Sequence, residues 1–255
     1  MDTAAWFSLA GKRALVTGGS RGIGEMIARA YVAAGAEVLI ASRDADACRR
    51  VADELGDACA AVTADLSEPA GVEALAAAVA DWTDHLDVLV NNAGATWGAQ
   101  LGSYPAEGFD KVMDLNVRAV FLLTQAVLPQ LRAAATPEDP ARVLMVGSVD
   151  GMTVPIFDSF AYSASKAAVH HLSTHLAAAL APDHVTVNAL APGLFPSRMT
   201  AFLFGEQDAV TARIPLGRPG RLEDVGGMAI ALAARAGSYV TGTVLPIDGG
   251  YSTLR

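Results

Sequence analysis

Short apolar runs recur along the chain, and each is followed by a stretch in which apolar positions return at helical spacing. Runs of this kind, bounded by glycine, proline or polar residues, are typical of strands buried in a parallel sheet. The stretches between them are typical of helices that cover such a sheet. The predicted strands are Arg13–Thr17, Glu37–Ala41, Ala60–Ala64, Asp87–Val90, Arg142–Val146, Val185–Leu190 and Thr243–Ile247.

Helices are predicted in the intervals between these strands, and neither repeats nor low-complexity linkers interrupt the alternation. They are expected at Glu25–Val32, from Ala45 onward, at Glu68–Trp82, over a long tract Glu107–Ala135, at Tyr162–Leu180 and at Leu222–Arg235. Regular alternation of strand and helix predicts a doubly wound parallel sheet with right-handed crossovers. We therefore expect an α/β fold in which residues 1–255 form a single Rossmann-like domain. Its sheet has about seven strands, in the order 3-2-1-4-5-6-7, with helices on both faces.

Composition narrows the kind of molecule. Hydrophobic residues make up 52% of the 255 positions, which is enough for one substantial core. The net charge of -9 disfavours a nucleic-acid or anionic-membrane surface, because such surfaces need clustered Lys and Arg. The two cysteines, Cys48 and Cys59, are too few for a disulfide framework. With no basic leader and no long apolar run, the chain is expected to be soluble and cytoplasmic.

A glycine-rich loop joins the first predicted strand to the first helix, with Gly18, Gly22 and Gly24 spaced as G-x-x-x-G-x-G. Glycines let a backbone turn tightly and approach a pyrophosphate, and the helix N-terminus presents unpaired N–H groups to phosphate. A glycine cluster alone is often only a turn, but its place between strand and helix predicts a dinucleotide site. Arg21 is either a second phosphate ligand or a solvated surface arginine.

The second predicted strand ends at Ser42-Arg43, where a dinucleotide fold meets the adenosine ribose. An acidic residue there would accept hydrogen bonds from a free 2'-hydroxyl, whereas a guanidinium offers a charge-assisted fork to a 2'-phosphate. The sequence therefore favours NADP over NAD. Asp44 complicates this prediction, but it is also well placed to cap the helix that begins near Ala45.

Tyr162 and Lys166 stand four residues apart on a predicted helix, so that the phenol and the ammonium lie on one face. Desolvation raises the pKa of a tyrosine, and a neighbouring cation lowers it. We expect Lys166 to lower the pKa of Tyr162 and to let it act as a general acid and base. The same spacing also arises by chance on helices, so the rest of the chain has to support this interpretation.

Several motifs that are weak alone occur together in one order. They are Thr17-Gly-x3-Gly22-x-Gly24, Asn91-Asn-Ala-Gly94, Asn116, Ser148, Tyr162-x3-Lys166 and Pro192-Gly193. With them the chain resembles the short-chain dehydrogenase/reductase family over nearly its whole length. Within that family it resembles the 3-oxoacyl thioester reductases, and among these the rhamnolipid-pathway type. The stretches that carry this closer likeness are residues 7–11, 91–98 and 191–200.

The resemblance implies a catalytic set of four residues. Tyr162 would donate the proton in a reduction, and Lys166 would lower its pKa and hold the nicotinamide ribose. Ser148 would hydrogen-bond the substrate carbonyl, and Asn116 would hold a water that links Lys166 to a proton relay. Ser148 stands one residue farther from Tyr162 than in many relatives, a difference that the loop between them can absorb, although Ser159 and Ser163 are also near.

The resemblance also implies NADP(H) as the cofactor and a set of residues that contact it. Asp65 and Leu66 would meet the adenine, Ser42 and Arg43 the 2'-phosphate. The full set is Gly18, Ser20, Arg21, Gly22, Ile23, Gly24, Ser42, Arg43, Asp65, Leu66, Asn92, Ala93, Gly94, Tyr162, Lys166, Pro192, Gly193, Leu194 and Ser197. No metal is expected, because His171 and His175 have helical metal spacing but lack the glutamate of an H-E-x-x-H motif.

The expected substrate is a small carbonyl or alcohol compound with an apolar part. A segment without clear period, 194–214, is expected to form a substrate lid. Apolar residues there and in loops of the same sheet edge suit an apolar tail, or else serve as lid packing or subunit contacts. They are Trp97, Met152, Phe157, Phe195, Met199, Phe202, Leu203 and Phe204.

Acidic residues near the ends of the long helices, Glu138, Asp139 and Asp183, would repel an acidic carrier protein, so an acyl-CoA or a free carbonyl is expected instead. Two alternatives stay open. One is an alcohol, sugar or steroid dehydrogenase of the same family, and the other is a cofactor-sensing module that uses the fold without catalysis. The complete set of four catalytic residues argues against a sensor. The family resemblance also implies a homotetramer, or a dimer.

Overall fold

The computed structural model describes residues 2–155, 157–196 and 211–253. Its centre is a sheet of seven strands in the order β3-β2-β1-β4-β5-β6-β7, and every neighbouring pair is parallel. The predicted fold class and strand order are thus confirmed. The strands are β1 (Arg13–Thr17), β2 (Glu37–Ser42), β3 (Cys59–Thr63), β4 (Val88–Asn91), β5 (Ala141–Val146), β6 (Val185–Pro192) and β7 (Val244–Ile247).

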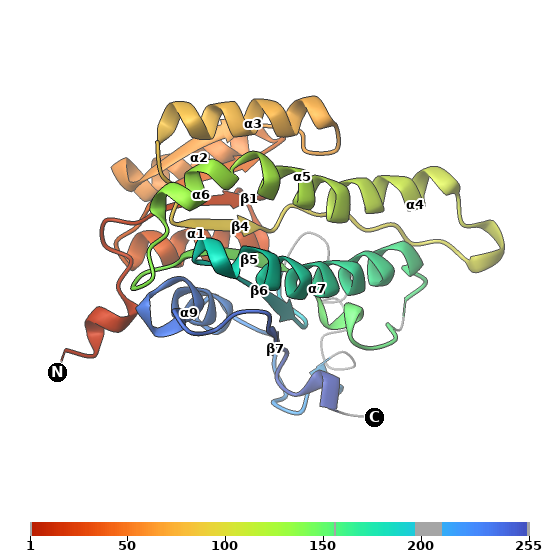
Figure 1. Ribbon diagram of the computed structural model, residues 1–255. Helices are drawn as coiled ribbons and strands as arrows, with labels where there is room; N and C mark the ends of the chain where they lie inside the picture. The colour runs from red at the N-terminus through yellow and green to blue at the C-terminus, as the bar shows by residue number, and fades with distance from the viewer. Residues whose placement is uncertain (1, 156, 197–210, 254–255) are drawn as a thin grey trace.

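Helices cover both faces of this sheet (Figure 1). One buried cluster joins α3, α5 and α7 to one face, and a second joins α1, α2 and α9 to the other. Because the central strands are covered on both sides, β4 and β5 are buried along their whole length and are apolar apart from Asn91 and Arg142. The helices are α1 (Gly22–Ala33), α2 (Ala45–Leu55), α3 (Pro69–Trp82), α4 (Ala106–Met113), α5 (Ala119–Ala126), α6 (Leu128–Ala134), α7 (Phe160–Leu180) and α9 (Leu222–Ala233).

The long helical tract predicted at Glu107–Ala135 is wrong as one continuous helix. A π-helical turn, Asp114–Arg118, separates α4 from α5, and a break at Val127 separates α5 from α6 with a bend of 54°. Pro129 lies in the first turn of α6, where its missing N–H costs nothing, but it cannot continue the helix before it. The other predicted helices and strands differ from the observed ones only at their ends.

The start of α2 confirms the expected capping role of Asp44, whose carboxylate accepts a hydrogen bond of 3.0 Å from the backbone N–H of Ala47.

In the part of the chain that the structure describes, no single helix is long and apolar enough to cross a membrane. One bent pair, Ala106–Ala126 with Leu128–Ala134, meets that test by length and composition alone.

Candidate active site

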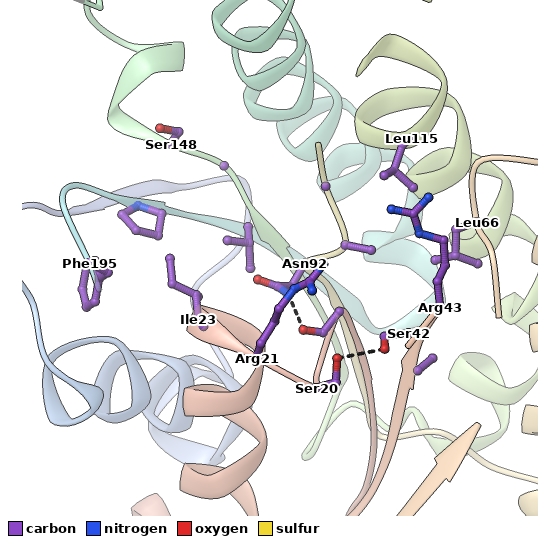
Figure 2. Close-up of a pocket in the computed structure, with 18 of the residues that line it drawn as sticks. Ser20, Arg21, Ile23, Ser42, Arg43, Leu66, Asn92, Leu115, Ser148 and Phe195 are labelled. Carbon is purple, nitrogen blue, oxygen red and sulfur yellow. Dashed lines mark hydrogen bonds between the residues drawn. The ribbon is translucent and has the colours of Figure 1, made fainter. Parts of the chain in front are cut away.

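The parallel strands all end at one edge of the sheet, and a cavity of about 510 Å³ lies there. Open α/β sheets bind their ligands at this edge. Figure 2 shows Ser42 and Arg43 at one end of the cavity and Ser148 and Phe195 at the other. The cavity therefore joins the predicted phosphate corner to the predicted catalytic residues.

The glycine loop forms a tight turn between β1 and α1. Gly18 and Gly22 have φ of 65° and 56°, in the left-handed region that favours glycine. A Cβ on Gly24 would lie 2.3 Å from the side-chain nitrogen of Asn92, so only glycine lets α1 begin so close to the end of β4. That nitrogen donates to the backbone oxygens of Thr17 (2.8 Å) and Gly18 (3.2 Å), which fixes the loop on the neighbouring strand end.

The end of β2 forms a polar corner of the cavity. The hydroxyl of Ser20 donates to that of Ser42 at 2.8 Å, and the thiol of Cys48 lies 3.1 Å from the same Ser42 oxygen. Arg43 is 54% exposed and pairs only loosely with Asp65, at 3.7 Å. The Arg43 guanidinium is therefore available to an anion in the cavity.

Tyr162 and Lys166 both line the cavity from α7. The Lys166 ammonium is buried, lies 5.6 Å from the centre of the Tyr162 ring and donates to the backbone oxygen of Val146 at 2.7 Å. Burial lowers the pKa of Lys166 to about 8, because desolvation disfavours the charged form.

The net shift of the Tyr162 pKa is upward, contrary to the expectation that Lys166 lowers it. Burial raises the pKa of Tyr162 to about 12, hydrogen bonding to Ser148 works in the opposite direction, and the charge of Asp150 raises it further. Lys166 is not among the groups that shift the pKa of Tyr162 here. The site thus holds a protonated phenol beside a hydroxyl that can share a ligand oxygen.

Asn116 lies in the π-helical turn and is buried behind the cavity rather than lining it. Its side-chain oxygen accepts from the N–H of Ala95 at 2.8 Å, and its side-chain nitrogen donates to the oxygen of Ala95 (3.0 Å) and to the hydroxyl of Ser165 (2.9 Å). The Asn116 side chain therefore ties the loop after β4 to α7. A Cβ on Gly94 would lie 3.2 Å from the Asn116 oxygen and 3.7 Å from the Lys166 ammonium, so the two groups are close.

Most of the predicted cofactor residues line the cavity, and so do three of the four catalytic candidates, Ser148, Tyr162 and Lys166. Gly24 lies behind it, Leu194 lines a second cavity of about 700 Å³ that shares Phe195 with the first, and Ser197 lies outside the described residues. Several further lining residues were not predicted, and most of them lie at strand ends, where the alternation of side chains could have identified them. They are Ala41, Asp44, Ala64, Leu115, Val146 and Gly147.

The apolar residues that were predicted to line a site for a substrate tail do not all lie at the cavity. Phe195 lines the cavity, and Met152 and Phe157 are exposed by 44% and 42% on nearby loops. Trp97 has a different role: its indole packs on Gly108, where a Cβ would lie 2.8 Å from the ring, and Lys111 lies over it at 5.4 Å. The other candidates, Met199, Phe202, Leu203 and Phe204, lie outside the described residues, as does most of the predicted lid.

No group of three or more His, Cys, Asp or Glu within residues 2–155, 157–196 and 211–253 is placed to hold a metal ion. The phenol of Tyr162 beside the hydroxyl of Ser148 supports acid–base chemistry, next to a cavity that also has a basic corner and a glycine loop.

Comparison with known proteins places this geometry among oxidoreductases. The family model described as enoyl-(acyl carrier protein) reductase matches residues 18–252. A rhamnolipids biosynthesis 3-oxoacyl-[acyl-carrier-protein] reductase from Pseudomonas aeruginosa is 52% identical over 252 residues, which cover 96% of this chain and 98% of the relative.

Two solved structures show the same fold. The RhlG/NADP active-site complex of Pseudomonas aeruginosa superposes with a TM-score of 0.94 at 52% identity and covers 97% of this chain and 99% of its own. A short-chain type dehydrogenase/reductase from Mycobacterium marinum superposes with a TM-score of 0.91 at 35% identity, with coverage of 98% and 99%.

Proposed function

Because the chain belongs to the short-chain dehydrogenase/reductase family, we propose that it is an NADPH-dependent reductase of 3-oxoacyl thioesters. The observation that carries the proposal is that Ser148, Tyr162 and Lys166 line the same cavity as the glycine loop and the Ser42–Arg43 corner. The similarity to a 3-oxoacyl-[acyl-carrier-protein] reductase supports the choice of substrate class.

The cavity residues fit NADPH. The glycine loop and the start of α1 supply backbone N–H groups for the pyrophosphate. Arg43 supplies an available guanidinium for the 2'-phosphate, and Ser42 supplies a hydroxyl beside it. The only carboxylate next to this corner in sequence, Asp44, is engaged in capping α2, so it does not take the place of a ribose-binding acid.

The reaction needs a hydride at the ketone carbon and a proton at its oxygen. NADPH supplies the hydride when bound. Ser148 and Tyr162 are placed to hydrogen-bond the ketone oxygen, where negative charge develops. The high pKa of Tyr162 keeps the phenol protonated at neutral pH, so Tyr162 can donate its proton to that oxygen. Lys166 adds a positive charge next to the phenol and can bond a ribose hydroxyl of the cofactor.

After Tyr162 has given up its proton, the phenol has to be protonated again. We propose that the π-helical turn around Asn116 takes part in this step. Both side-chain N–H groups of Asn116 are used in bonds to Ala95 and Ser165, and its side-chain oxygen accepts from Ala95. A π-helical turn interrupts the regular i→i−4 bonding of the backbone. We therefore assign any relay water near Lys166 to the main chain of this turn rather than to the Asn116 amide.

The folded structure weakens the argument that the substrate is carried by CoA and not by an acidic carrier protein. Asp183 pairs with Arg132 at 2.8 Å, and Asp139 pairs with Lys12 at 2.8 Å and with Arg142 at 3.2 Å. These ion pairs reduce the repulsion that the bare carboxylates would exert on an acidic carrier. The proposal therefore covers the 3-oxoacyl thioester as a class, and both carriers enter the test.

The proposal includes a homotetramer in the cytoplasm. Phe121 on α5, Phe160 on α7 and Phe109 on α4 are 43%, 39% and 41% exposed, which suits helix contacts between copies. The last strand, β7, lies at an edge of the sheet, open to a second copy. Two unpaired, buried cysteines suit a reducing compartment. Light scattering at several protein concentrations tests the assembly, and a monomer would contradict it.

A substrate panel tests the proposed function. NADPH consumption is measured with one 3-oxoacyl group carried by CoA and by acyl carrier protein, and with sugar and steroid ketones at equal concentration. We expect turnover of at least one thioester to exceed that of the sugars and steroids. The exposed apolar residues Met152, Val154 and Phe157 near the site favour an acyl tail over a polyhydroxylated substrate. Preferential turnover of a sugar would support the dehydrogenase alternative instead.

A further inference from the structure

A third side chain of α7 follows Tyr162 and Lys166 on the same helix face. His170 stands four residues after Lys166 and eight after Tyr162, so all three project from one side of the helix. Unlike the neighbouring His171, which is exposed, His170 is 7% exposed. It does not line the cavity, and neither the proposed proton transfer nor the proposed cofactor contacts use it.

The His170 ring packs against the segment that carries Ser148. A Cβ on Gly147 would lie 2.1 Å from the Nε2 atom of His170, and a Cβ on Gly151 would lie 2.9 Å from its Cε1 atom. Glycine is therefore needed on both sides of Ser148 for the ring to fit. Between these glycines the backbone N–H of Ser148 points at the ring nitrogen Nε2 and donates to it over 3.4 Å.

Two side chains of α7 thus hold the end of β5 on either side of Gly147. Lys166 donates to the backbone oxygen of Val146 at 2.7 Å, and His170 accepts from the N–H of Ser148. The acceptor role requires a neutral imidazole with its proton on Nδ1. Burial, with a further contribution from the charge of Lys166, lowers the pKa of His170 to about 4, so the ring stays neutral at the pH at which the protein works.

We propose that His170 is a positioning residue for the reduction, which fixes the backbone of Ser148 so that its hydroxyl faces Tyr162 and the ketone oxygen. The inference rests on the proposed function for its catalytic part only. Ser148 begins a single turn, Val149–Gly151, and its hydroxyl accepts from the N–H of Asp150 at 3.1 Å. Without the bond to His170, the N–H of Ser148 loses its acceptor, and the turn gains freedom to move the hydroxyl away from the phenol.

The test compares His170→Gln, whose amide oxygen can accept from Ser148, with His170→Leu, which has no acceptor. His171→Leu is the matched control on the exposed face of α7. We expect His170→Leu to lower kcat by about tenfold with little change in NADPH affinity, because one hydrogen bond of modest strength is lost. His170→Gln should recover most of the rate, and His171→Leu should retain it. If His170→Leu does not fold, His170→Asn, whose amide is too short to reach Ser148, replaces it.

A double-mutant cycle separates positioning from general support of the fold. In a Ser148→Ala background, the change at His170 should cost no further rate, because there is no hydroxyl left to position. An equal loss in both backgrounds, or equal impairment by Gln and Leu, would overturn the inference.

Amide hydrogen exchange at Ser148 gives a readout that needs no substrate. We expect faster exchange in His170→Leu than in wild type, and unchanged protection would also overturn the inference. If the wild type reduces no thioester but protection of the Ser148 amide still depends on His170, the proposed function fails and the positioning role remains.

Discussion

Under the proposed function, the choice between NADPH and NADH depends on Arg43. Its guanidinium is exposed by 54% and has only a loose ion pair with Asp65 to give up. We expect Arg43→Ala to raise the KM for NADPH by about 10- to 100-fold, which corresponds to the loss of a charge-assisted hydrogen bond. The KM for NADH should hardly change, since NADH has no 2'-phosphate.

Steady-state kinetics with both cofactors measures this effect. The control is Arg49→Ala, because Arg49 is equally basic but lies on α2 in an exposed pair with Asp46. A loss of the same size for NADPH and NADH in Arg43→Ala would show that Arg43 does not recognise the 2'-phosphate.

Under the proposed function, we expect Lys166 to set the pH dependence of the reduction. Its pKa is lowered to about 8 by burial, so in the free enzyme the ammonium is present below that pH and is lost as the pH rises through it. Tyr162, with a pKa of about 12, keeps its proton over the same range. We therefore expect kcat/KM for reduction to be level from about pH 6 to 7 and to fall above about pH 8, since kcat/KM reports the groups of the free enzyme.

Lys166→Arg provides the comparison, because a guanidinium stays charged throughout this range. Its rate should be lower but should not fall between pH 8 and 10. A wild-type profile that stays level up to pH 10 would contradict the assignment to Lys166.

Tyr162, Lys166 and Ser148 were predicted from motifs that resemble those of a known family, although Ser148 departs from the usual spacing by one residue, whereas His170 was not predicted. Metal spacing drew attention to His171 and His175 instead, which are both exposed. A helical signal was present, since His170 continues the face of Tyr162 and Lys166. The contact to Ser148 crosses from α7 to the end of β5, and such tertiary contacts are not visible in local spacing.

At the scale of elements, the strands were predictable because buried parallel strands are continuous apolar runs. The π-helical turn at Asp114–Arg118 was not, since no local residue type demands it. It is held from outside: Asn116 bonds both backbone groups of Ala95 and the hydroxyl of Ser165. The turn therefore depends on tertiary contacts that helical periodicity does not report.

Replacement of Asn116 tests that dependence. Asn116→Leu would leave the partly buried N–H and C=O of Ala95 without this partner and would place an apolar group against the hydroxyl of Ser165, so we expect the free energy of unfolding to fall by about 2–4 kcal/mol. Urea denaturation followed by circular dichroism measures the change. Gln125→Leu, at an exposed position of α5, is the control and should have an effect below about 0.5 kcal/mol. If both variants unfold alike, Asn116 does not tie the loop to α7.

At the scale of the whole molecule, a charged side chain is buried near the start of β5, at the opposite end of the strand from the cavity. Arg142 on β5 is 1% exposed, and its Nη2 donates to Asp139 and to the oxygen of Ala234, both at 3.2 Å. Its Nε and Nη1 atoms have no protein partner. A buried ion with unmade bonds contributes little to stability or opposes it.

We therefore expect Arg142→Met to leave the free energy of unfolding unchanged or to raise it by about 1–2 kcal/mol, since Asp139 keeps its ion pair with Lys12. Thermal denaturation measures this effect, and Arg118→Met, which breaks an exposed pair with Asp114, is the control. A loss of more than about 2 kcal/mol in Arg142→Met would mean that the guanidinium is better satisfied than its contacts indicate.

The strand order brings motifs that are far apart in the sequence to one edge of the sheet. Strand–helix alternation predicted the fold class, and the parallel strands explain why residues 18, 42, 148 and 162 share one cavity. The substrate cannot be derived in the same way, because loops at the sheet edge determine it and much of the predicted lid lies outside the described residues.

The most direct test of the account is the rate of NADPH oxidation with a short 3-oxoacyl thioester in wild type and in Tyr162→Phe, with NADPH binding measured in both. We expect the wild type to turn over and Tyr162→Phe to lose at least about 100-fold in kcat, because general acid catalysis contributes roughly that much. NADPH affinity should be nearly equal. A Tyr162→Phe variant that reduces the thioester at the wild-type rate would contradict the central claim that Tyr162 is the proton donor.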